Sequence, residues 1–275
     1  MSIFAPDPFS SRHIGLTETD IKKMLDVLGM DSIDAILDAV VPAAIRSTTP
    51  LATPEALSEP ASLARLREIA NQNQVWRSYI GAGYHGTHTP AAILRNLLEN
   101  PGWYTAYTPY QAEISQGRLE ALLNFQTMVS DLTGFDCANA SLLDEATAAA
   151  EAMTMSRRVL KKRKDAKTFF VDQGCNPQSI AVVQTRAEPL GYNVIVGDAA
   201  TYDFSQETFG VLIQVPATDG TLLDPTDFIT RAHEHGAIAT VSVDPLAMVL
   251  IKSPAACGAD IAIGSSQRFG VPMGY

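Results

Sequence analysis

An aspartate closes one of the strand-like stretches of the sequence. Asp244 follows "IATVSV", a run of small and β-branched residues that is typical of a buried strand. Ligands of open α/β sheets bind beyond the carboxyl ends of the strands, where the carboxylate of Asp244 could pair with a cationic ring nitrogen. The alternative is structural, because Asp244 could equally cap a helix over "PLAMVL".

A second strand and loop follow in "GADIAIGSSQRFGVPMGY", residues 258–275. In pyridoxal phosphate (PLP) enzymes of the aspartate aminotransferase fold, the Schiff-base lysine follows such a strand, a few tens of residues after the aspartate that binds the cofactor ring. Here Gln267 occupies the place of the Schiff-base lysine, 23 residues after Asp244, and Arg268 follows it. Glutamine has no amine and a guanidinium stays protonated, so neither forms an imine. The sequence predicts a degenerate PLP-type site without a catalytic residue, in which Asp244 is the ring-binding position.

Two further segments carry side chains that suit the rim of a site. The stretch "NPGWYTAYTPYQ", residues 100–111, places aromatic rings with polar tips on an irregular segment. Such a segment is typical of a surface that binds a ligand. The motif "HGTH" places His85 and His88 just before a helix start expected at Thr89. Helical metal-ligand geometry is therefore absent, and we expect these histidines to line a site or bond within the loop rather than to bind a metal.

These residues need a sheet to position them. From residue 168 on, short apolar runs alternate with capped helical stretches, which predicts βαβ units and a mainly parallel sheet. The expected strands are 168–172, 192–198, 210–217, 237–244 and 259–266. The predicted fold class is therefore α/β, with the sheet in the second half of the chain and helices in front of it.

The first part of the chain is expected to be helical. Residues 17–42 predict two short amphipathic helices, and the proline-rich stretch 46–61 predicts an extended linker. Further helices are expected over 62–74, after Thr89, from a cap at Ser115 to Gly134, and over 145–164. We therefore divide the chain into a helical pair with a linker arm, 1–61, and an α/β domain, 62–275.

Composition excludes several classes of protein. The chain of 275 residues carries a net charge of −10, which argues against nucleic acid or an anionic membrane as the main partner. Its three cysteines are widely spaced, so a disulfide framework is not expected. Neither a signal or transit peptide nor a membrane-spanning apolar run is recognisable, and we expect a cytoplasmic protein.

Long stretches of the sequence resemble one family. From "RHIG" onward, and above all in "NPGWYTAYTPYQ" and "SLLDEATAAAEAM", the chain is similar to the N-terminal part of the glycine cleavage system P-protein, the PLP-dependent glycine dehydrogenase (decarboxylating). The resemblance implies the large domain of a PLP-dependent transferase of fold type I. Family members are several times longer and consist of two related halves, so we expect this chain to be an incomplete N-terminal portion.

The resemblance also implies different roles for the two halves of the enzyme. The lysine that holds PLP belongs to the second half, in an "HK" motif absent here, which accounts for Gln267. This chain would complete the site of the lysine-bearing half, with Tyr107, Tyr110, Gln111, His85 and His88 at the substrate rim. The complete enzyme would decarboxylate glycine and pass the aminomethyl group to the lipoyl arm of H-protein. The chain alone, with no PLP expected on it, would be inactive.

Two alternatives remain open at this point. The chain could be a non-catalytic scaffold that stabilises the catalytic half or docks H-protein, with its aromatic rings packed against that half. It could also be an independent PLP enzyme that uses another lysine. The second alternative is disfavoured because no lysine occurs between Lys167 and Lys252, or after Lys252.

Overall fold

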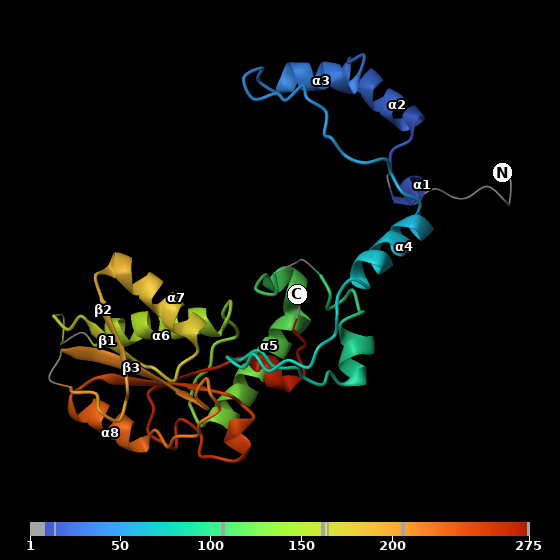
Figure 1. The fold of residues 1–275 in the computed structure, drawn as a ribbon. Helices are drawn as coiled ribbons and strands as arrows, with labels where there is room; N and C mark the ends of the chain where they lie inside the picture. Colours follow the sequence, from blue (N-terminus) through green and yellow to red (C-terminus); the bar gives the residue numbers. More distant parts are fainter. Residues whose placement is uncertain are drawn as a thin grey trace. The chain divides into compact units, whose positions relative to one another are not determined.

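The computed structural model describes residues 9–13, 15–105, 108–160, 163, 165–204 and 207–273. The chain divides into two compact units, Met1–Arg77 and Ser78–Tyr275. Figure 1 shows the course of the chain through both units. The boundary expected after residue 61 falls inside helix α4, Glu59–Ala70, and the assignment of domains stays a prediction.

The first unit is helical, as the sequence predicted. Its helices are α1 (Phe9–His13), α2 (Glu18–Leu28), α3 (Ile33–Val40) and α4 (Glu59–Ala70). Thr17 and Asp20 form a reciprocal capping box at the start of α2, and Gly29 ends that helix in the left-handed region. Ser32, rather than Asp31, caps α3. The two short helices expected over residues 17–42 are confirmed.

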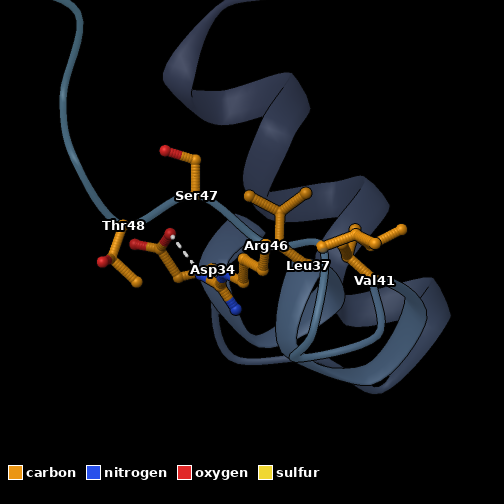
Figure 2. A pocket seen from close by; sticks show the side chains of 7 residues that line it. Asp34, Leu37, Val41, Arg46, Ser47 and Thr48 are labelled. Atoms are coloured by element: carbon orange, nitrogen blue, oxygen red, sulfur yellow. Dashed lines mark ion pairs between the residues drawn. The ribbon is translucent and has the colours of Figure 1, made fainter.

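The apolar stripes of α2 and α3 are not covered within the unit. Neither helix has a buried residue, and apolar side chains such as Val27 and Val40 are exposed. A pocket lies beside α3, where Arg46 pairs with Asp34 at 3.6 Å (Figure 2) and also with Asp38. Charge pairs, not a packed core, therefore connect the end of the helical pair to the linker.

The second unit contains the sheet and most of the core. Its longer helices are α5 (Ala112–Thr133), α6 (Glu145–Val159), α7 (Pro177–Ala187) and α8 (Thr226–Glu234). Its short helical turns are η1 (Ile93–Leu97), η2 (Glu188–Leu190), η3 (Ala247–Val249) and η4 (Ser266–Phe269). Its strands are β1 (Thr168–Asp172), β2 (Asn193–Gly197), β3 (Thr208–Val215), β4 (Ile238–Val243) and β5 (Ile261–Ile263).

The predicted parallel sheet is confirmed. The strands lie in the order β2-β1-β3-β4-β5, and every neighbouring pair is parallel. Helices α6 and α7 cover one face of the sheet and α8 covers the other (Figure 1). Alternation along β1 explains how both faces are filled, since Phe169 and Val171 join the core under α6 and α7 while Phe170 joins the core under α8.

The start of α5 differs from the expectation. The span of α5 begins at Ala112, after Gln111 and three residues before the start expected at Ser115. Ser115 has non-helical dihedral angles, φ −126° and ψ 28°, and marks a kink inside α5. Its buried hydroxyl donates to the Thr108 carbonyl at 3.3 Å, which holds the preceding loop against the kink.

Glycine is required where the end of β5 passes β4. A Cβ atom on Gly264 would overlap the backbone carbonyl oxygen of Val243, the last residue of β4. Gly117, in contrast, lies in α5 with open space where its Cβ atom would be. The two glycines make a matched pair for testing the packing of the strand ends.

We expect Gly264→Ala to destabilise the chain by about 2–3 kcal/mol, because backbone must move to admit the methyl group. Gly117→Ala should leave stability unchanged or raise it by about 0.5–1 kcal/mol, since alanine favours helix. Urea unfolding midpoints of both full-length variants measure the difference. Equal midpoints for the two variants would contradict the packing described for Gly264.

Candidate functional site

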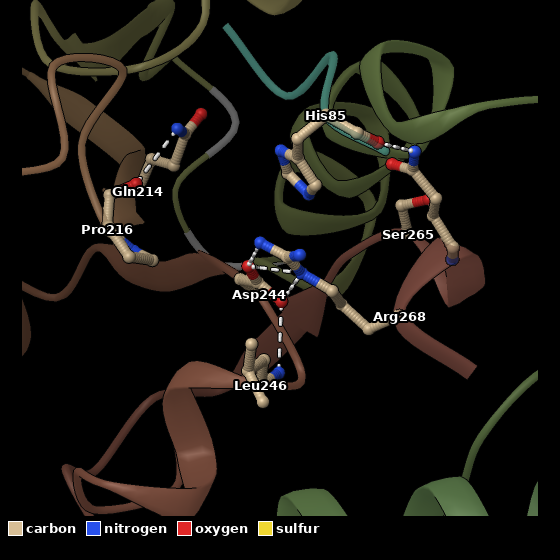
Figure 3. Close-up of polar contacts among 8 residues, drawn as sticks. His85, Gln214, Pro216, Asp244, Leu246, Ser265 and Arg268 are labelled. Carbon is tan, nitrogen blue, oxygen red and sulfur yellow. Dashed lines mark hydrogen bonds and ion pairs between the residues drawn. The ribbon is translucent and has the colours of Figure 1, made fainter. Parts of the chain in front are cut away.

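The parallel sheet brings several strand ends to one edge. Asp244 follows β4 there, Gly264 follows β5, and the segment 265–271 continues from β5 across the edge. The glycine-rich segment 81–90 meets the same place, because hydrogen bonds join it to 265–271. The candidate site is built from these three parts (Figure 3).

Asp244 takes part in two kinds of interaction within the chain. Its Oδ1 atom accepts a hydrogen bond from the Leu246 backbone at 2.9 Å, which starts the turn that follows β4. Both carboxylate oxygens also accept from Arg268, whose Nε atom lies 2.9 and 3.1 Å from them. A second guanidinium nitrogen lies 2.8 Å from Oδ2. The carboxylate therefore has a cationic partner that belongs to the chain itself.

Gln267 lies on the turn η4, next to Arg268. The Ser265 hydroxyl accepts from the Gln267 backbone at 3.2 Å and caps this turn. The side-chain amide of Gln267 donates to the backbone carbonyl of His85 at 2.6 Å. The side chain in the expected place of the lysine is therefore bound to the glycine-rich segment.

The segment that carries the histidines is fixed at several points. The Thr87 hydroxyl donates to the Val271 carbonyl at 2.8 Å, and Gln178 of α7 donates to the Ala82 carbonyl at 2.6 Å. Ala82 has a φ of +53°, an unusual conformation for a residue with a side chain. His85 is half-buried, and its ring points toward Asp244 and Arg268 (Figure 3). His88 is exposed.

The aromatic segment lies in a different local environment. The Tyr110 hydroxyl is 3.0 Å from the Ser141 hydroxyl, and the tyrosine is 58% exposed. Gln111 is exposed at the start of α5, where its backbone carbonyl accepts from Ser115. The described hydrogen bonds of both residues run to these partners and not to Asp244 or Gln267, and Tyr107 lies outside the described residues.

Carboxylates surround the start of α6. Asp144 caps the helix by accepting from the Thr147 backbone at 2.6 Å. Glu145 accepts a hydrogen bond from the Ser242 hydroxyl of β4 at 2.8 Å. Two negative side chains thus stand at a helix start that would otherwise attract an anion.

Burial makes the Cys175 thiol unsuited to act as a nucleophile. Burial, and then the nearby carboxylate of Asp172, raises the pKa of the Cys175 thiol well above its ordinary range, so the thiol stays protonated.

Within the described ranges, no group of three or more His, Cys, Asp or Glu side chains is placed to hold a metal ion. None of the helices in the described part of the chain combines the length and apolar character needed to cross a membrane.

Two contacts of the site were missed in the sequence. The Asp244–Arg268 pair joins residues on consecutive strand-to-loop junctions, and the Glu145–Ser242 bond joins a helix start to a neighbouring strand. The first could have been found from the sequence, because an arginine after β5 faces the carboxylate after β4 if those two strands are neighbours. The second depends on how α6 lies on the sheet, which no local signal indicates.

Comparison with known proteins gives a consistent result. The family model described as "Glycine cleavage system P-protein" matches residues 11–275. A glycine dehydrogenase (decarboxylating) of Nostoc punctiforme is 59% identical over 267 residues, which cover 97% of this chain and 27% of the relative. One of Allorhizobium ampelinum is 59% identical over 273 residues, 99% of this chain and 28% of the relative. The chain therefore spans little more than a quarter of the length of these relatives.

The fold agrees with a solved structure of the same kind. A crystal structure of glycine decarboxylase (P-protein) of the glycine cleavage system, in inhibitor-bound form, superposes with a TM-score of 0.83 at 34% sequence identity. The match covers 94% of this chain and 59% of that chain. The predicted fold class is thus confirmed by architecture and by comparison.

A network of buried amide hydrogen bonds lies beside the site, and its contribution to stability can be tested. Gln214 of β3 accepts from the Asn176 backbone at 2.8 Å and donates to the Pro216 carbonyl at 2.9 Å (Figure 3). We expect Gln214→Leu to cost about 2 kcal/mol, because these buried partners lose their hydrogen bonds. Gln184→Leu, on an exposed position of α7, should change stability by less than about 0.5 kcal/mol. Thermal and urea unfolding of both variants measure this, and an equally small effect of Gln214→Leu would show that the network is dispensable.

Proposed function

This chain belongs to the glycine cleavage system P-protein family, and we propose that it contributes the N-terminal portion of a PLP-dependent glycine decarboxylase. The complete enzyme would decarboxylate glycine and transfer the aminomethyl group to the lipoyl arm of H-protein. Its partners would be a lysine-bearing half of P-protein and lipoylated H-protein. The observation that carries the proposal is that the chain has the fold of this family while Gln267 occupies the expected place of the lysine. Asp244, at the end of β4, is already paired with Arg268.

The residues around Asp244 do not fit PLP. The carboxylate that would bind the ring nitrogen is occupied by Arg268, and the Gln267 side chain is bound to a backbone carbonyl. Asp144 and Glu145 would repel a phosphate group at the start of α6. We therefore propose that PLP in the complete enzyme is held by the other half, and that this chain alone is inactive.

The contribution of this chain would be the rim of a shared site. PLP, where it is bound, supplies an electron sink for loss of carbon dioxide. The roles left for this chain are to bind and orient the substrate and to exclude water. We assign these roles to His85, His88, Tyr110, Gln111 and Tyr107, the last of which is included from the sequence alone.

Exposed apolar side chains support the presence of a partner. In the second unit, Leu143 is 87% exposed and Leu250 is 82% exposed. A partner that covers such side chains would gain stability from them, because their apolar surface is removed from water. We propose that the lysine-bearing half covers part of this surface.

The first test concerns the cofactor. We expect PLP titration of the isolated chain, followed by borohydride reduction and peptide mass mapping, to give no stoichiometric pyridoxyl adduct. The physical reason is that no lysine stands at position 267 and that Asp244 is already paired. The complex with the lysine-bearing half is the control and should acquire the adduct on the partner. A stoichiometric adduct on this chain, for example at Lys252, would mean that it has an active site of its own.

The second test separates a shared site from a scaffold. In a complex co-expressed with the lysine-bearing half, Tyr107→Phe and Tyr110→Phe should each lower glycine decarboxylation about tenfold, because each removes one hydroxyl hydrogen bond from the site. Tyr104→Phe is the matched control and should retain turnover. Release of carbon dioxide from carboxyl-labelled glycine with lipoylated H-protein measures the rate. Unchanged turnover in both test variants, with the complex assembled, would favour the scaffold function.

A further inference from the structure

Two consecutive side chains reach in different directions from η4. Arg268 binds both carboxylate oxygens of Asp244 at the end of β4. Gln267 donates to the His85 carbonyl at 2.6 Å, and the Thr87 hydroxyl donates back to the Val271 carbonyl at 2.8 Å. Residues 265–271 are thus tied to the sheet on one side and to the histidine segment on the other (Figure 3).

We propose that Gln267 and Arg268 are positioning residues that together form a clamp, which fixes residues 85–88 on the carboxyl edge of the sheet. Arg268 supplies the cation that Asp244 needs, and Gln267 uses the place of a Schiff-base lysine to hold the backbone at His85. The hydrogen bonds of the clamp engage the groups that a cofactor would otherwise contact. Only the purpose of the clamp, to present His85 and His88 at a shared site, rests on the proposed function.

The packing around η4 supports a closed clamp. Gly270 has a φ of +97°, and a Cβ atom there would lie 2.7 Å from Pro90 Cδ and 3.2 Å from the His88 carbonyl. The segment and the histidine loop therefore touch at a third place, which only glycine permits. The side chains of Arg268 and Asp244 are 27% and 22% exposed, so solvent screens their attraction less than that of a surface pair.

Hydrogen exchange of the full chain tests the clamp. Peptides covering 79–92 contain the Tyr84 amide, which bonds to Gly81, and peptides covering 266–273 contain the Val271 amide, which bonds to Gln267. Arg268→Gln should speed exchange about tenfold in both regions, because it releases η4 from the sheet. Gln267→Glu, which replaces the amide donor by an acceptor of the same shape, should speed exchange only in 79–92. Unchanged exchange in 79–92 in both variants would overturn the proposal.

A double-mutant cycle separates the clamp from general loss of stability. If Arg268 acts through Asp244, the double variant Asp244→Asn/Arg268→Gln should exchange no faster than the faster single variant. Additive effects would mean that Arg268 acts elsewhere. Arg186→Gln, which breaks the exposed pair of Arg186 with Glu151, is the matched control and should leave both regions unchanged.

Hydrogen exchange in the presence of PLP distinguishes this proposal from the proposed function. Addition of PLP should not alter exchange in either region of the unmodified chain, since the clamp already fills the contacts of Asp244. Slower exchange in both regions with PLP would show that the cofactor binds there and would overturn the clamp. The measurement involves neither turnover nor a partner, so failed decarboxylation in the assembled complex would contradict the proposed function alone.

Discussion

The parallel pairing of β3, β4 and β5 is the constraint on which the site depends. In this register Val215 pairs with Val243, and Ser242 pairs with Ile263, so all three strands end at the same edge. Each loop that leaves this edge starts within reach of the next. Asp244 and Arg268 are 24 residues apart in the sequence, yet they meet because their strands are neighbours. The close passage of Gly264 beside Val243 tightens the same junction.

Charge balance at this edge follows from burial. A half-buried carboxylate loses part of its hydration and needs hydrogen bonds and a cation in return. Asp244 receives both from Leu246 and Arg268. Removal of one partner would leave the other charge uncompensated, which costs more than the pair contributes when it is intact. Asp244 therefore has its hydrogen bonds and its cation within the chain, and a ring cation would have to displace Arg268 of η4.

Periodicity predicted the sheet well and the site only in part. Strands rich in valine and isoleucine, separated by capped helices, indicated their own positions and a mainly parallel sheet. The start of α5 was placed too late because Ser115 is a good cap by type, although its hydroxyl bonds backward to Thr108. Residue type alone identified Asp244 and Gln267 as candidates in the sequence. Their partners, Arg268 and the His85 carbonyl, depend on which segments the fold brings together, and local pattern does not contain that information.

The two residues at the centre of the edge differ in how replaceable they are. Gln267 bonds to a backbone carbonyl, so the fold requires only a hydrogen-bond donor of suitable length at that position. Asp244 meets a backbone amide and a guanidinium at once, and a neutral side chain would leave Arg268 without its counterion. A lysine could therefore be absent from position 267 without loss of the architecture, whereas the aspartate is needed whether or not a cofactor is bound. The same edge can thus persist in a chain that has no lysine at position 267, because its acid residue also stabilises the fold.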